Sequence, residues 1–141
     1  MALSVVLDTN VLIAALRSKR GASYLVLSRV GGGEFELDLS VPLVLEYEEV
    51  AKRDSRALGL THAEIDDVID YLCAIGHHRR IHFLWRPVLR DAQDDMVLEL
   101  AVEAGSDCII THNIRDFAGA DRFGVRVLTP IAFLKSIGVI P

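Results

Sequence analysis

The sequence predicts an α/β fold: a three-layer sandwich with a central, mostly parallel sheet of four to five strands. Short apolar runs alternate along the chain with amphipathic helical patterns, which is the order typical of parallel sheets. The first of these runs, over residues 4–7, is apolar on both sides, as expected of a strand buried on both faces. Hydrophobic residues make up 51% of the chain and the mean hydropathy is +0.33, a composition that suits a sheet covered by helices. The length of 141 residues predicts a single domain over 1–141.

Each element has its own sequence signal. Thr61 and Glu64 have capping-box spacing, Pro42 suits a first helical turn, and Gly105 suits a helix end. Over residues 35–39, apolar residues alternate with Glu36 and Asp38, which predicts a strand with one more polar face. The expected strands are 4–7, 35–39, 81–85, 108–110 and 125–128. The expected helices are 11–16, 22–30, one starting at 40–42, 61–75, 93–104 and 129–137.

Acidic and amide residues follow the ends of the predicted strands. Asp8 follows the first strand, Glu46 lies one turn into the helix after the second, and Asp94 begins the helix after the third. Asn113 and Asp116 follow the fourth strand. Each residue has a simpler explanation as a helix cap, a turn former or a solvated side chain. Because the carboxyl ends of parallel strands meet at one sheet edge, however, the sequence predicts that these residues converge.

Such a cluster of carboxylates indicates a divalent cation. Carboxylates held together repel one another and raise each other's pKa, and no lysine recurs among them to offset the charge. Oxygen ligands without a zinc-like set of Cys and His favour Mg²⁺ or Mn²⁺. One or two such ions activate water and stabilise the leaving oxygen in phosphodiester hydrolysis.

Four motifs give the chain a family resemblance that covers nearly its whole length. It resembles PIN-domain ribonucleases, and especially the VapC-like prokaryotic toxins, so the expected fold is PIN-like. The motifs are residues 6–11, 42–46, 91–101 and 111–117.

The resemblance implies a role for each site residue. Asp8, Glu46 and Asp94 correspond to the metal-binding acids, and Asp94 is preferred over its neighbours Asp91 and Asp95 from its spacing to residues 101–105. The family often has an Asp where this chain has Asn113, which leaves Asp116 as the candidate for the fourth acid. The implied catalytic residues are Asp8, Glu46, Asp94 and Asp116, with Thr9, Asn10, Thr111 and Asn113 supporting them.

The resulting prediction is a Mg²⁺- or Mn²⁺-dependent endoribonuclease, the toxin of a type II toxin–antitoxin pair. Its expected partners are an RNA substrate, a cognate antitoxin and a second copy of the chain, bound through helices 22–30 and 61–75. One alternative is a catalytically silent PIN module that acts through protein or RNA binding. Another is a Mg²⁺-dependent phosphoryl-transfer protein. A haloacid-dehalogenase-like phosphatase would need an aspartate at Asn10, and a receiver domain would need a lysine after a late strand.

Composition predicts a cytoplasmic protein with no membrane association. No apolar stretch is long enough to span a bilayer, and the N-terminus lacks signal-peptide features. Cys73 and Cys108 lie in apolar patterns, as expected of core residues in a reducing compartment. The net charge of −5 does not indicate nucleic-acid binding, but basic residues gather in several expected loops, including 17–20 and 112–126.

Overall fold

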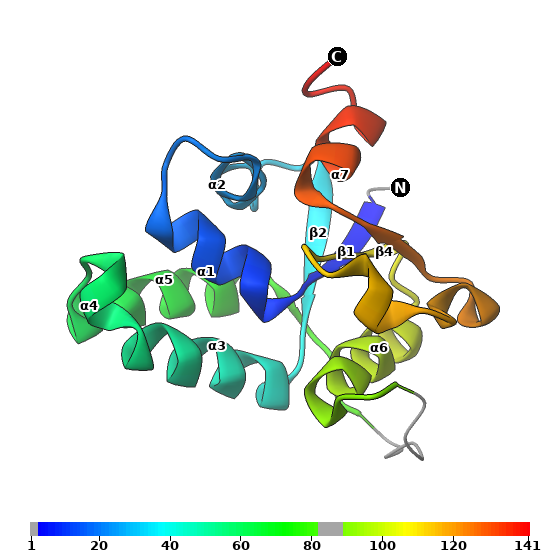
Figure 1. The fold of residues 1–141 in the computed structure, drawn as a ribbon, viewed down its shortest axis with the longest axis horizontal. Helices are drawn as coiled ribbons and strands as arrows, with labels where there is room; N and C mark the ends of the chain where they lie inside the picture. Colours follow the sequence, from blue (N-terminus) through cyan, green and yellow to red (C-terminus); the bar gives the residue numbers. More distant parts are fainter. Residues whose placement is uncertain (1–2, 82–88) are drawn as a thin grey trace.

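Five parallel strands form one central sheet in the computed structural model, which describes residues 3–81 and 89–141 (Figure 1). The spatial order is β3-β2-β1-β4-β5, and every neighbouring pair is parallel. Central β1 pairs with β2 on one side and β4 on the other, so that Val5 lies opposite both Leu37 and Cys108. The strands are β1 (Leu3–Leu7), β2 (Phe35–Leu39), β3 (His77–His78), β4 (Cys108–Ile110) and β5 (Arg126–Leu128). The predicted α/β class and parallel sheet are confirmed.

Helices cover both faces of this sheet. On one face α6 packs against β1, β2 and β4, whereas α1, α2, α3 and α5 pack together on the other, as Figure 1 shows. The helices are α1 (Thr9–Arg17), α2 (Ala22–Ser28), α3 (Val41–Arg53), α4 (Ser55–Leu58), α5 (His62–Ile75), α6 (Ala92–Ala104) and α7 (Pro130–Ser136), with the 3-10 turns η1 (Ile114–Phe117) and η2 (Ala120–Phe123). Val5, Val6 and Leu7 of β1 are at most 1% exposed, as the uniformly apolar run predicted.

Local capping signals set most helix boundaries. Thr61 and Glu64 form both hydrogen bonds of the predicted capping box, at 3.0 and 3.1 Å. Gly105 ends α6 in the left-handed conformation, with φ of 65°, which glycine adopts without steric cost. Helix α1 begins two residues earlier than expected, because Asp8 caps it.

The third strand of the sheet lies at His77–His78, where the sequence predicted loop surface. We expected it over 81–85, of which 82–85 lie outside the described residues, and expected His77–His78 to be loop surface. The structure instead pairs His77 and His78 with Asp38 and Leu39 of β2, and both histidines are exposed. A two-residue strand at the sheet edge needs no apolar pattern, so hydrophobicity could not locate it.

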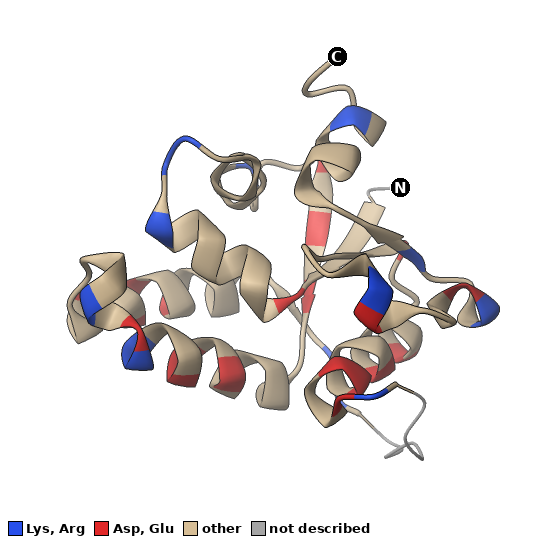
Figure 2. Cartoon of the chain, viewed as in Figure 1, with Lys and Arg blue, Asp and Glu red and all other residues tan. Residues whose placement is uncertain are grey.

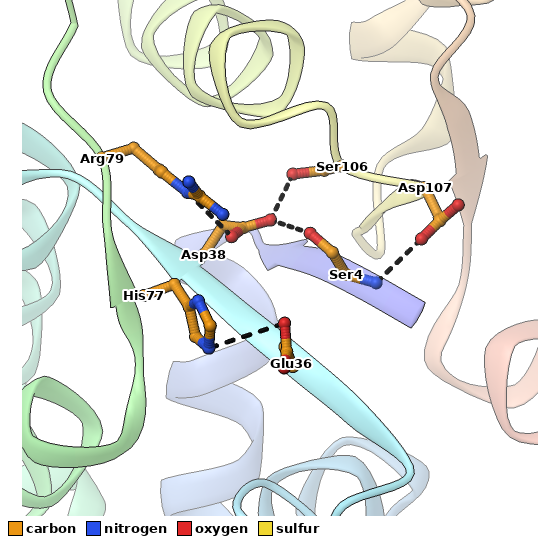
Figure 3. A network of polar contacts seen from close by, with 7 residues as sticks. All are labelled: Ser4, Glu36, Asp38, His77, Arg79, Ser106 and Asp107. Carbon is orange, nitrogen blue, oxygen red and sulfur yellow. Dashed lines mark hydrogen bonds and ion pairs between the residues drawn. The ribbon is translucent and has the colours of Figure 1, made fainter. Parts of the chain in front are cut away.

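Asp38 was also predicted wrongly, because it is fully buried rather than part of a polar face. Figure 3 shows its carboxylate between β1, β3 and the segment before β4. The hydroxyl of Ser106 donates to Asp38 at 2.6 Å, the hydroxyl of Ser4 also donates to it, and Arg79 Nε lies 3.5 Å from its other oxygen. Glu36, two residues earlier, is exposed and lies beside His77. Hydrogen bonds and an ion pair thus offset the cost of burying this charge.

The strand order creates a switch point beside β1. From β1 the chain proceeds to β2 and β3 on one side, and it later returns to β4 and β5 on the other. The crevice beyond the carboxyl ends of β1 and β4 is therefore where ligands bind in open parallel sheets. Asp8 follows β1 and Thr111 follows β4, so the predicted site lies at this crevice.

No helix within the described ranges is long and apolar enough to cross a membrane.

Candidate active site

An open cleft of about 560 Å³ lies at this switch point. It is formed by the segments that follow β1 and β4, one side of α1 along its whole length, one side of α3, the start of α6 and part of η1. All four predicted catalytic acids line it, so the expected convergence is observed. Thr9, Asn10 and Asn113 also line the cleft, whereas Thr111 lies beneath it and is fully buried. The lining residues that carry charge or hydrogen-bonding groups are Asp8, Thr9, Asn10, Arg17, Glu46, Arg53, Asp91, Gln93, Asp94, His112, Asn113 and Asp116.

Asp8 is the most deeply held of the acids and is 7% exposed. Its carboxylate accepts hydrogen bonds from the backbone N–H of Thr9 at 2.9 Å and from the hydroxyl of Thr111 at 2.7 Å. It therefore caps α1 and lines the cleft at the same time, so the cap interpretation is confirmed and does not exclude a role in the cleft. Burial raises the pKa of Asp8, and these hydrogen bonds only partly oppose that rise.

Glu46 reaches the cleft from the second turn of α3, where the hydroxyl of Thr9 donates to its carboxylate. Burial is the main cause of its raised pKa, to which the nearby negative charges of Asp8 and Asp91 add. Directly beside it, Tyr47 is fully buried and donates its hydroxyl hydrogen to the carbonyl of Leu7. These contacts connect α3 to the end of β1, so the two acids are positioned relative to each other.

The three aspartates at the start of α6 have different roles. Asp91 caps the helix by accepting from the N–H of Gln93 at 2.9 Å. Asp95 is buried and accepts from the N–H of Leu89 at 2.9 Å. Asp94 lines the cleft, and Asp91 lines it as well, so only Asp95 is separated from the cleft by its burial. Helical geometry explains the difference, because adjacent residues project about 100° apart around the axis.

Asp94 shows the effect of gathered negative charge most clearly. Its pKa is raised from 3.8 to about 7, first by burial and then by the charges of Asp8, Asp91, Asp116 and Glu46. Repulsion of this kind identifies carboxylates that share one site.

The turn after β4 supplies the remaining predicted residues. Thr111 donates to Asp8, and its oxygen accepts from the N–H of Asn113 at 3.0 Å and from the side-chain amide of Asn10 at 3.4 Å. Asn10 also accepts from the N–H of His112 at 3.3 Å. This network fixes the turn against the start of α1. Asp116 lies on η1 at the exposed rim of the cleft.

The donor set fits a hard divalent cation. Among the described residues, no Lys or Arg forms an ion pair with Asp8, Glu46, Asp94 or Asp116, so the charge of the cleft is not neutralised within that part of the chain. Within the same part of the chain, no group of three or more Asp, Glu, His or Cys side chains is arranged so that it could hold a metal ion. An open, all-oxygen site is compatible with Mg²⁺ or Mn²⁺, since Mg²⁺ keeps several water ligands.

Sequence reasoning missed Arg53 and Gln93 among the residues that line the cleft, and it missed the hydrogen bond between buried Tyr47 and Leu7. One signal was available for Arg53: positions 46, 50 and 53 follow helical spacing, and all three side chains line the cleft. The hydrogen bond from the Tyr47 hydroxyl to the carbonyl of Leu7 joins α3 to β1, and no local sequence pattern indicates such a contact.

Fold and site together define an α/β protein with a carboxylate-lined cleft at the switch point of a parallel sheet. A family model described as PIN domain matches residues 4–115, which is most of the chain. The chain belongs to the PIN domain family, whose members are generally nucleases. No curated protein matches the chain significantly. The phosphatase and receiver-domain alternatives do not agree with this assignment.

Proposed function

We propose that this protein is a Mg²⁺- or Mn²⁺-dependent endoribonuclease. The observation that carries the proposal is the group of five acidic residues that line one open cleft (Asp8, Glu46, Asp91, Asp94 and Asp116), in which Asp94 has a pKa raised to about 7. A nuclease cleft must accept a polyanion, so a cleft lined by five acids requires cations that offset their charge. The PIN family assignment supports a nuclease of this chemistry.

Asp8, Glu46 and Asp94 would hold the ion, which when bound polarises the scissile phosphate and lowers the pKa of a water. The chain's own residues position these ligands: Thr111 orients Asp8, and Thr9 orients Glu46. Asp116, exposed at the rim, is placed to orient the attacking water or to bind a weaker second ion.

Basic side chains flank the acids on two sides. Arg17 and Arg53 line one part of the cleft, and Arg90 and Arg115 line an adjoining hollow that shares Asp116 with it. These arginines hold the phosphates on either side of the scissile bond and do not contact base edges. An RNA strand then crosses the cleft with its cleaved phosphate over the acids, despite the net charge of −5.

Glu46 and Glu49 provide a matched test, because both are on α3 but only Glu46 lines the cleft. With Mn²⁺ and a pool of structured RNAs, Glu46→Gln should lower cleavage by about a hundredfold, the order of loss when one electrostatic group of an active site is removed. The Glu49→Gln variant should cleave RNA as the wild type does. Chelator should stop cleavage by the wild type and by Glu49→Gln alike. RNA binding without metal-dependent cleavage by the wild type would instead support the catalytically silent module.

We also propose a toxin role, which rests on the resemblance of the opening, central and late motifs to VapC-like toxins. Expression in bacteria should then arrest growth for the wild type but not for Glu46→Gln. A cognate antitoxin would cover the acidic cleft. A homodimer through α2 and α5 is supported by an apolar hollow between them, lined by Leu27, Val68 and the half-exposed Tyr71. Light scattering that reports a monomer would contradict the dimer.

A further inference from the structure

A second cavity, of about 500 Å³, adjoins the acidic cleft. It lies between α1, the start of α2, the turn after β4 and the start of α7. Its apolar wall includes Ala14, Ala22, Pro130 and Ile131, and Ile131 is 52% exposed. We call this cavity the side pocket.

The side pocket and the acidic cleft share three lining residues, which are Ala14, Arg17 and His112. A ligand that occupies the cleft can therefore extend into the side pocket without leaving the surface. Arg17 lies where the two spaces meet, and no described acid pairs with it. Its guanidinium is thus available for a phosphate.

His112 lies between the acidic cleft and the side pocket, and hydrogen bonds fix its position. Its Nε2 lies 2.7 Å from the hydroxyl of Ser23, a side chain that is only 4% exposed. Its backbone N–H donates to Asn10 at 3.3 Å. The hydrogen bond to Ser23 fixes one edge of the imidazole, and the residue as a whole is exposed and lines both spaces, where a ligand would contact it.

A nucleotide has the chemistry that this arrangement matches. Unpaired bases bind in proteins by stacking on aromatic rings and apolar surfaces, with polar groups at their edges and an arginine on the neighbouring phosphate. The side pocket offers an apolar wall, an imidazole and the hydroxyls of Ser18 and Thr129, beside Arg17. An apolar side chain of a peptide would pack against the apolar wall of the side pocket. It would leave Arg17, which lies beside the acidic cleft, without a partner.

We propose that the side pocket binds the nucleobase of a nucleotide next to the scissile phosphate, and that His112 helps to determine which bases are accepted. This inference rests on the proposed nuclease function and extends it, because it predicts a substrate that is single-stranded at the cleavage site. A base paired in a duplex is not free to enter the pocket.

The direct test monitors methyl resonances by NMR while nucleoside 5′-monophosphates are added, with ribose 5-phosphate as the matched control without a base. The methyl groups of Ile131 should shift with at least one nucleotide and not with ribose 5-phosphate. The methyl groups of Val41, which is 67% exposed on α3 and does not line the pocket, should shift with neither. No shift of Ile131 with any of the four nucleotides would overturn the proposal.

Two variants connect the pocket to cleavage. Ala22→Phe fills the side pocket and should lower kcat/KM for RNA by about tenfold, the order of loss for one stacked base. Ala57→Phe, on an exposed position of α4 that lines neither the side pocket nor the acidic cleft, is its control. If Ala22→Phe fails to fold, Ile131→Ser with Val41→Ser as control makes the same comparison with milder changes on the surface.

The outcomes separate the two proposals. Normal RNA cleavage by Ala22→Phe and Ile131→Ser overturns the base pocket but leaves the nuclease function standing. Nucleotide shifts at Ile131 in a protein that cleaves no RNA would support the pocket and contradict the nuclease. A third outcome is that the Ala22→Phe variant cleaves RNA normally but no longer binds a co-expressed protein that the wild type binds. That result would assign the pocket to the protein partner and overturn the proposal.

Discussion

Replacing Asp94 by Asn should stabilise the metal-free protein, with a pH dependence that follows from the crowding of carboxylates. The pKa of Asp94 is raised from 3.8 to about 7 in the folded chain, by burial and then by four neighbouring acids. Between these two pH values the unfolded chain has ionised Asp94 and the folded chain has not. Because the folded state then binds more protons, the wild type loses stability as pH rises through this window.

The size of the effect follows from the shift. At about 1.4 kcal/mol per pKa unit, the full shift would correspond to about 4 kcal/mol. Asp94 is partly exposed, and solvent screening reduces this to about 1–2 kcal/mol. For a chain of this length, that difference raises the melting temperature by about 3–7 °C. The advantage of Asp94→Asn should be absent near pH 4, grow towards pH 7 and remain level above it.

Thermal unfolding in chelator between pH 4 and 8 measures this difference. Asp67→Asn, an exposed change on α5 away from the cleft, should show no such trend. Adding Mn²⁺ at pH 7.5 should stabilise the wild type more than Asp94→Asn, because the variant lacks one ligand. A variant that is less stable than the wild type in chelator at pH 8, or a difference that does not change with pH, would refute the reasoning.

Three further predictions concern the rest of the site. Asp8→Ala should lower cleavage by about a hundredfold and Asp116→Ala by about tenfold, because Asp116 lies at the exposed rim; equal losses would make Asp116 a principal metal ligand. Asn113→Asp should tighten Mn²⁺ binding by about several-fold in a calorimetric titration, since it adds a charged oxygen to the cleft. Tyr47→Phe should lower the free energy of unfolding by about 1 kcal/mol in urea, because it removes the hydrogen bond to Leu7; an unchanged midpoint would show that this bond adds no stability.

The boundaries of the main elements could be predicted because their signals are local. The capping box of Thr61 and Glu64 sets the start of α5, and the alternation over Phe35–Leu39 sets β2. The site could be predicted for a related reason. The connections that leave parallel strands begin at the carboxyl edge of the sheet, wherever each strand is placed. Asp8 directly follows β1, whereas Glu46, Asp94 and Asp116 lie further along the connections after β2, β3 and β4, and all four line one cleft.

Other features depended on contacts between distant segments. Asp38 has the spacing of a solvated residue, yet it is buried because Ser4, Ser106 and Arg79 provide its partners. Likewise, Ser23 and His112 are 89 residues apart in the sequence, and only the packing of α2 beside the turn after β4 brings them together. Hydrophobic periodicity indicates which face of each helix or strand is buried in the core. It contains no information about which polar side chains from distant segments form hydrogen bonds with one another. The sequence by itself therefore determined the parallel sheet apart from β3, its covering helices and the acids that line the cleft. Tertiary structure alone decided the partners of Asp38 and the pocket beside the acidic cleft.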